Sequence, residues 1–186
     1  MPEIKSLTCT NLIRCSALVL ICLPLTSKVI AQPLLQFDAP TEWLKHQQNS
    51  PLQVARFDLP RVDGDSEDAE LTVNYFNQEE ERVEALLERL TNQMLQPDDR
   101  PSADVATTTR FEISEMLITV LDVPGIFSAL VEPNSKMRYY KKGFRLKVAV
   151  IEGPTGPLLF KLIGPERTVV RWEPIFTAFL ESVRFE

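Results

Sequence analysis

Alternating apolar and polar side chains predict two neighbouring strands in the first half of the chain. The first runs over 53–59 and is ended by Pro60, and the second runs over 69–76. The apolar side chains that share a face are Ala55, Phe57 and Leu59 in the first and Leu71, Val73 and Tyr75 in the second. Because the turn between them is short, we expect an antiparallel pair.

Two other stretches carry apolar residues three and four positions apart, which predicts amphipathic helices. The two stripes are Val83, Leu86, Leu87, Leu90 and Met94, and Val169, Trp172, Phe176, Phe179, Leu180 and Val183. We expect Asn77 to cap the first helix with Glu80 as its reciprocal partner, and Pro97 to stop it. In the second, a short turn begins at Thr168, and the main helix runs over 174–182 with Pro174 in its first turn.

Four further strands are predicted over 105–113, 116–123, 144–151 and 158–163, with a hairpin loop at 153–157. The segment 117–121 is apolar on both faces, so it should lie centrally under at least one helix. In 144–150 the apolar residues alternate with Arg145, Lys147 and Ala149, which indicates a face nearer to solvent. This order of elements predicts an α+β fold, an antiparallel β-sheet flanked by helices.

The N-terminus has the pattern of a secretory signal. Lys5 and Arg14 precede an apolar run over 17–25, and small or modest side chains at Val29 and Ala31 suit cleavage before Gln32. We therefore predict a signal peptide over 1–31, an irregular leader over 32–52 and a single domain over 53–186. The protein would be exported to the periplasm or medium, with no transmembrane helix in the mature chain. An uncleaved anchor and lipidation at Cys22 are the alternatives.

Composition narrows the chemistry of the mature chain. Cys9, Cys15 and Cys22 all lie in the predicted signal, so disulfides, thiolate metal sites and cysteine nucleophiles are excluded after cleavage. The net charge is −6, and it becomes −8 once Glu3 and the three basic residues of 1–31 are removed. Such a charge disfavours nucleic acid and anionic membranes as partners. His46, the single histidine, is expected to be exposed, and it excludes a zinc site built from several histidines.

Acidic residues offer two further hypotheses. The turn over 63–70 could hold calcium through Asp63, Asp65 and Glu67, but its spacing is not that of a calcium loop, so we expect a solvated turn and no cofactor. A carboxylate-dependent, possibly calcium-assisted hydrolase is the alternative function. The acids nearest to apolar strands are Glu70, Glu112, Glu115 and Asp122.

A basic stretch with aromatic residues is the candidate partner-binding site. Its residues are Lys136, Arg138, Tyr139, Tyr140, Lys141 and Lys142. Aromatic rings among cations are typical of surfaces that bind anionic groups. The polar loop over 97–104 is a second candidate for the same surface.

Short motifs along the chain resemble the PsbP-like family of exported bacterial proteins. They are Phe37, Pro40 and Trp43; Ala55-x-Phe57-x-Leu59-Pro60; Gly64-Asp65-x-Glu67-Asp68-Ala69-Glu70-Leu71-x-Val73; Phe160-Lys161-Leu162-x-Gly164-Pro165; and Phe179-Leu180-x-Ser182. The resemblance implies an α/β/α sandwich around a curved antiparallel sheet and a non-catalytic role. No catalytic motif accompanies it. We therefore expect an exported binding or adaptor domain, not an enzyme, that docks a protein or a small ligand.

Overall fold

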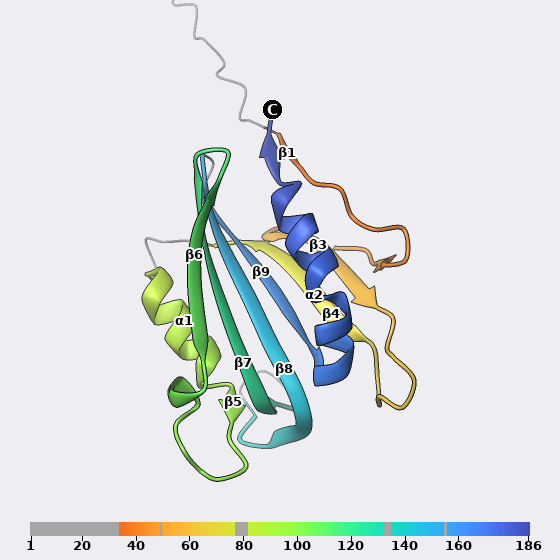
Figure 1. Ribbon diagram of the computed structural model, residues 1–186, viewed down its shortest axis with the longest axis vertical. Helices are drawn as coiled ribbons and strands as arrows, with labels where there is room; N and C mark the ends of the chain where they lie inside the picture. The colour runs from red at the N-terminus through yellow and green to blue at the C-terminus, as the bar shows by residue number, and fades with distance from the viewer. Residues whose placement is uncertain (1–33, 49, 77–81, 132–134, 155) are drawn as a thin grey trace, which may run out of the picture. The chain divides into compact units, whose positions relative to one another are not determined.

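The computed structural model describes residues 34–48, 50–76, 82–131, 135–154 and 156–186 (Figure 1). The chain separates into Met1–Ala31 and Gln32–Glu186, and every described residue belongs to the second unit. The predicted signal peptide and the predicted helix cap Asn77 with its partner Glu80 lie outside the described residues, so they stay predictions. Neither described helix combines the length and apolar character that crossing a bilayer requires.

An antiparallel sheet of eight strands forms the middle of the fold, in the order β2-β3-β4-β9-β8-β7-β5. β6 also pairs with β7, on the side of β7 away from β8. The strands are β2 Leu44–Lys45, β3 Gln53–Leu59, β4 Ala69–Tyr75, β5 Met94–Leu95, β6 Thr107–Ile113, β7 Met116–Leu130, β8 Arg138–Gly153 and β9 Gly156–Pro165. A separate pair joins β1 (Leu35–Gln36) to β10 (Arg184–Phe185). The predicted antiparallel pairing of 53–59 with 69–76 and the hairpin at 153–157 are confirmed.

The two helices, α1 (Val83–Thr91) and α2 (Glu166–Glu181), cover opposite faces of the sheet (Figure 1). On β8, Leu146 and Val148 pack into the core under α1, whereas Ala149 and Ile151 pack into the core under α2. Successive side chains of a strand point to opposite faces, so one strand serves both cores. The fold is the predicted α+β class with an α/β/α sandwich.

The face of β8 that was predicted to lie near solvent is instead buried. Lys147 and Ala149 are 6% and 0% exposed because α2 packs over this side of the strand. Lys147 tolerates burial because its ammonium group lies against the carboxylates of Asp122 and Glu173. The prediction that this face of β8 lies near solvent was therefore wrong. Alternation of apolar and charged residues cannot show that a charged residue is buried beside an opposite charge from elsewhere in the sequence.

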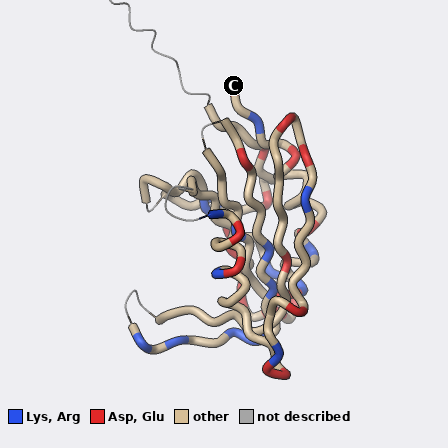
Figure 2. The backbone as a smooth tube through the Cα atoms, turned by 90° about the vertical axis from the view of Figure 1, so that its left-hand side faces the viewer, with Lys and Arg blue, Asp and Glu red and all other residues tan. Residues whose placement is uncertain are grey.

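β7 and β8 are also longer than predicted, because β7 continues past the Pro124–Gly125 pair through a register shift between Gly125 and Phe127. Gly125 has a φ of 149°, and a Cβ atom there would lie 2.5 Å from the carbonyl oxygen of Leu95. Only glycine fits so close to another backbone at this φ. Beyond the irregularity, the two strands extend as a hairpin away from the rest of the sheet, as Figure 2 shows at its lower left.

Both predicted helix boundaries differ from the structure. α1 ends at Thr91, and Met94 lies in β5, where it pairs with Phe127 of β7. α2 begins at Glu166 and continues through Pro174 without a break. Pro174 is on the exposed side of the helix, where water can satisfy the carbonyl group that lost its donor.

The leader contributes to the fold through both predicted apolar anchors. Trp43 is 4% exposed and packs edge-on against Trp172 and Phe179 of α2, with ring centroids 6.2 and 5.2 Å away. Phe37 packs against Phe179 at 5.1 Å. The described leader residues also form β1 and β2, which pair with β10 and β3.

Candidate functional site

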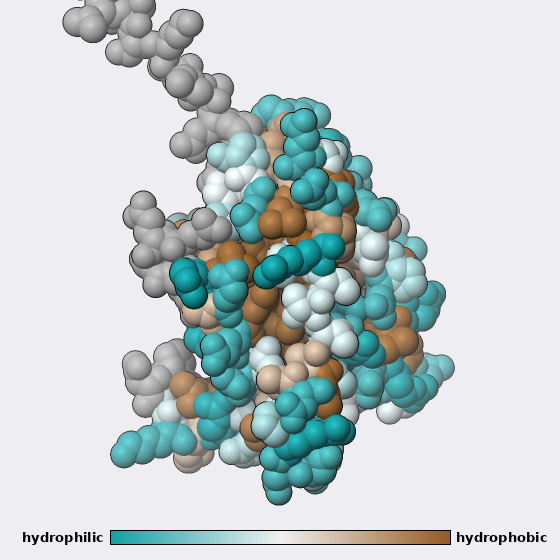
Figure 3. Space-filling model, turned by 60° about the vertical axis from the view of Figure 1, so that its left-hand side comes forward, coloured by the Kyte–Doolittle hydropathy of each residue, from teal (hydrophilic) through white to brown (hydrophobic). Residues whose placement is uncertain are grey.

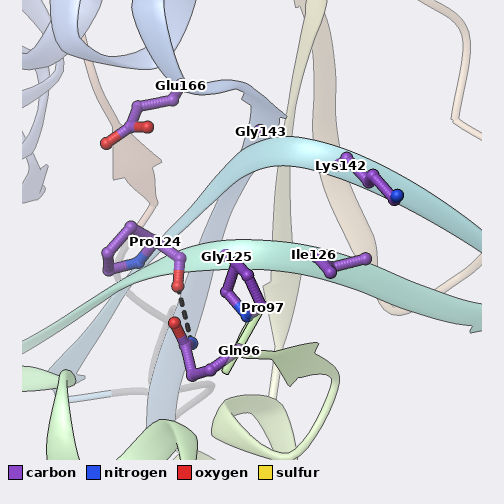
Figure 4. Close-up of a pocket in the computed structure, with 8 residues that line it drawn as sticks. All are labelled: Gln96, Pro97, Pro124, Gly125, Ile126, Lys142, Gly143 and Glu166. Atoms are coloured by element: carbon purple, nitrogen blue, oxygen red, sulfur yellow. Dashed lines mark hydrogen bonds between the residues drawn. The ribbon is translucent and has the colours of Figure 1, made fainter. Parts of the chain in front are cut away.

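The polar loop after α1 and the basic stretch of β8, which the sequence marked separately, meet at one pocket. The pocket has a volume of about 380 Å³. It is lined by Gln96, Pro97, Pro124, Gly125, Ile126, Lys142, Gly143 and Glu166 (Figure 4). Four segments far apart in the sequence therefore share its walls: the loop after β5, the irregular part of β7, the start of the extended hairpin on β8, and the first residue of α2. We call it the hairpin pocket.

A buried amide fixes one wall of the hairpin pocket. The Nε2 group of Gln96, a residue that is 8% exposed, donates to the carbonyl oxygen of Pro124 at 2.9 Å and to Ser102 Oγ at 3.0 Å. Ser102 Oγ in turn donates to the carbonyl oxygen of Met94 at 2.8 Å. This network ties the loop to β7, so the wall does not depend on a single contact. Nothing in the sequence pattern marked Gln96 except its place beside Pro97.

A second hollow of about 360 Å³ adjoins the first, because both are lined by Gln96, Pro97 and Ile126. Its remaining walls come from the end of α1 and β5 and from the predicted polar loop, including Asp99 and Arg100. The loop is thus folded against the sheet and offers charged groups of both signs along an open depression.

The extended hairpin, which we call the arm, comprises residues 126–131 and 135–142. Three predicted site residues in it have structural contacts. Arg138 donates to the hydroxyl and carbonyl oxygens of Ser128 at 2.7 and 2.8 Å. Lys141 donates to Glu67 at 2.5 Å and lies 5.6 Å from the ring centroid of Tyr139. These residues hold the arm together and join it to the sheet.

Five of the six predicted site residues are exposed, and three of these, Lys136, Tyr140 and Lys142, have no ion pair or side-chain hydrogen bond to any part of the chain that the structure describes. Beside them on the arm, Leu130, Val131 and Met137 expose 43%, 48% and 67% of their surface, and Tyr140 exposes 58%. The sequence pattern did not single out Leu130, Val131 and Met137. Met137 could have been found, because it stands between two cations of the same motif.

The two remaining cations of this strand belong to a buried ionic cluster under α2. Arg145 Nε and Nη2 donate to the two carboxylate oxygens of Asp122 at 2.7 and 2.8 Å, and Lys147 Nζ donates to Asp122 Oδ2 at 2.8 Å. Burial by itself would raise the pKa of Asp122, but the hydrogen bonds from Arg145 and Lys147 outweigh burial and lower this pKa. The hydrogen bond to Asp122 likewise raises the pKa of Arg145.

Among the acids considered for a hydrolase, Asp122 is held ionised by this cluster, so it is a poor proton donor. Glu70 forms an ion pair with Arg56 at 2.7 Å. His46, expected to be exposed, is half-buried with Nε2 2.7 Å from Asp58 Oδ2. Asp122 and Glu70 are thus each paired with a basic side chain, whereas hydrolysis by carboxylates uses two acids on either side of a substrate, one of them as a proton donor.

The acidic turn makes contacts within the protein. Asp65 Oδ2 accepts from Thr168, Glu67 accepts from Lys141, and Asp68 Oδ1 accepts from the backbone N–H of Arg61 at 2.9 Å. Across the described residues, no three acidic, histidine or cysteine side chains form a group that could hold a metal ion. The carboxylates of the turn are thus spread over separate protein donors.

One lysine has a lowered pKa away from these clusters. Burial lowers the pKa of Lys161 on β9, and Arg89 lowers it further, although Glu70 raises it. The ammonium group donates to Gln93 Oε1 at 3.0 Å and lies 5.4 Å from the ring centroid of Phe127. Lys161 therefore supports the base of the arm and is covered by its neighbours.

Comparison with known proteins concerns the fold. No protein-family model matches the chain, and no curated protein matches it in sequence. Two solved structures are similar to it. The protein of unknown function PA94 from Pseudomonas aeruginosa is 12% identical over 76% of this chain and 95% of its own, with a TM-score of 0.47. The cyanobacterial PsbP (CyanoP) from Synechocystis sp. PCC 6803 is 12% identical over 86% of this chain and 96% of its own, with a TM-score of 0.46. Neither likeness assigns a ligand, partner or activity to the chain.

Proposed function

We propose that this chain is an exported, non-catalytic binding domain that docks an acidic segment of a protein partner along the arm and into the hairpin pocket. Export is inferred from the signal pattern over 1–31. The binding role rests chiefly on one observation: Lys136 and Lys142 project from the arm without a carboxylate partner among the described residues, in a chain with a net charge of −6.

Charge supports an acidic partner. In the same strand Lys141, Arg145 and Lys147 are each neutralised by a carboxylate of this chain, although the chain has an excess of acids. Lys136 and Lys142 remain available on the arm, whose basic residues appear in blue in Figure 2. Unpaired cations at the rim of an interface steer an acidic partner and select against a basic one.

Apolar exposure supports a protein partner. Leu130, Val131, Met137 and Tyr140 lie on a short hairpin, where their exposed surface serves no core of the domain. Grouped exposed apolar side chains next to charged ones are typical of protein-binding surfaces, and tyrosine and methionine are enriched in them. A small ligand would need the pocket alone and would leave the arm without a role.

The hairpin pocket gives the surface a place for an anchoring side chain. Its volume of about 380 Å³ can accept one large side chain of a bound segment. Lys142 belongs both to the arm and to the pocket wall, so a segment that follows the arm reaches the pocket without a gap. The Gln96 network keeps this wall in place before the partner arrives.

Site-specific cross-linking in the native cell tests this proposal. A photoreactive residue at Met137 should form one adduct that is absent when the same residue stands at Val170, an exposed position on α2. In the Met137 variant, adding Lys136→Glu and Lys142→Glu should lower the adduct yield about tenfold. Lys45→Glu, which changes an exposed lysine on β2, should leave the yield unchanged.

The proposal is wrong if no adduct forms at Met137, if Val170 gives the same adduct, or if the adduct persists unchanged in the variant with both glutamates. Circular dichroism melting of each variant checks that the fold is intact. Because the three lysines changed are exposed, we expect the midpoints to agree with that of the unchanged protein.

A further inference from the structure

β6 is an open edge of the sheet. Among the described strands it pairs with β7 alone, so the backbone groups along its other side have no strand partner. A hollow of about 240 Å³ touches Thr107, Thr109 and Phe111 on one face of β6, and another of about 620 Å³ touches Thr108 and Arg110 on the other. Helix residues also line both hollows, from α2 on the first face and from α1 on the second, so the two helices flank the faces of β6.

The side chains of β6 are complementary to a second copy of the same strand. We propose that two copies of this chain join antiparallel through β6, about a two-fold axis at Phe111, to form one continuous sheet. In this register Phe111 faces itself, Thr109 faces Ile113, and Arg110 faces Glu112 of the other copy. Two-fold symmetry repeats the last pair, so one interface gains two opposite-charge pairs.

Neighbouring registers lack this match. An axis at Arg110 would place the two arginines opposite each other, and an axis at Glu112 would do the same for the two glutamates. Like charges directly opposite destabilise a strand pair. Ser114 and Glu115, with φ of 48° and 66°, turn the chain back into β7 and so limit the pairing to 109–113.

The residues concerned are free to make the proposed pairs. Among the described residues, the one ion-pair contact of Arg110 is a long one of 3.9 Å with Glu84, and both side chains are more than half exposed. Glu112 is exposed and Phe111 is half-buried. With the left-hand side of Figure 1 brought forward, Figure 3 shows apolar surface framed by polar side chains on the side where β6 lies. Pairing would cover Phe111 and give each charge a partner.

Charge reversal at the two positions gives a direct test by analytical ultracentrifugation. The unchanged protein should dimerise with rising concentration. Arg110→Glu and Glu112→Arg should each weaken the dimer about thirtyfold, because each change turns two attractive pairs into two repulsive ones. An equimolar mixture of the two variants should regain the affinity as a mixed dimer, since one copy then carries two acids and the other two bases. The double variant R110E/E112R should regain it alone.

Two control variants distinguish pairing through β6 from a general effect of the charge of the protein on dimerisation. Glu84→Gln removes the contact of Arg110 within the chain, and Glu88→Arg reverses an exposed charge on α1, so both should leave the dimer unchanged. A protein that stays monomeric at every concentration overturns the proposal. So does a dimer that the two single changes leave intact, or a mixture of them that fails to dimerise.

Discussion

Asp65 and Thr168 are 103 positions apart, yet one carboxylate oxygen of Asp65 accepts both donors of Thr168. The backbone N–H donates at 3.0 Å and the hydroxyl at 2.6 Å. Thr168 is the third residue of α2, and the residue that precedes α2, Pro165, provides no side-chain cap. A carboxylate from the β3–β4 turn thus takes the place of a capping residue at the positive end of the helix.

Asp65→Ala should therefore lower the free energy of unfolding by about 1–2 kcal/mol, the usual cost of a lost helix cap. Urea denaturation at neutral pH measures the change. Asp63→Ala, two positions earlier on the same turn, is the matched control, because Asp63 is exposed and does not cap the helix. The stability of this variant should stay within about 0.5 kcal/mol of that of the unchanged protein. Equal losses in the two variants would contradict the capping role.

Calcium should not stabilise the domain. The carboxylates of Asp65, Glu67 and Asp68 each accept a hydrogen bond from a donor of the protein, so a cation would have to displace these donors. We expect the same melting midpoint with calcium and with a chelator, since a ligand that binds only the folded state would raise it. A rise that disappears when Asp63, Asp65 and Glu67 become alanine would instead support the calcium hypothesis.

The ionic cluster at Asp122 predicts how stability depends on pH. Because the pKa of this carboxyl is lower in the folded chain than its ordinary value of 3.8, the ionised form stabilises the fold above that value. The contribution is lost as the pH falls through the lowered folded value. Asp122→Asn should cost about 3 kcal/mol at neutral pH, because it leaves buried cations without their shared partner.

The measurement is denaturant unfolding of both proteins across the acid range. The difference between them should shrink as the pH falls below the ordinary carboxyl value. Glu181→Gln is the control, since this exposed acid on α2 should change stability by less than about 0.5 kcal/mol at any pH. A constant difference between Asp122→Asn and the unchanged protein over the whole range would refute the assignment.

Pro174 should be a point where the domain can be stabilised. It lies inside α2 and on its exposed side, so alanine can restore a backbone donor without disturbing the core. The gain should be about 1–2 kcal/mol, smaller than the full helical cost of proline because alanine also frees the unfolded chain. Thermal and urea denaturation measure it, and a loss of stability in Pro174→Ala would show that the ring makes contacts the helix needs.

Sequence periodicity predicted the elements well where one face of each is buried. The strand over 53–59 has the predicted bounds, and the stripe from Val169 to Val183 lies in the core under α2. Periodicity failed where a residue distant in the sequence decides whether a side chain is buried or which element it joins. Lys147 looked like a solvated residue because its neutralising acids, Asp122 and Glu173, are 25 and 26 positions away. Met94 fitted the helical period of α1, yet it pairs with Phe127 in the sheet.

By itself, the sequence determined the class of the fold, the order of its main elements, the absence of thiols after 31 and the basic aromatic stretch. These follow from local chemistry, since periodicity and composition act over a few residues. Only the tertiary structure decided which cations of that stretch are neutralised, brought Lys142 beside Gln96, placed Asp65 at the start of α2 and left β6 at an edge. The physical reason is that pairing and burial depend on contacts between residues far apart in the chain.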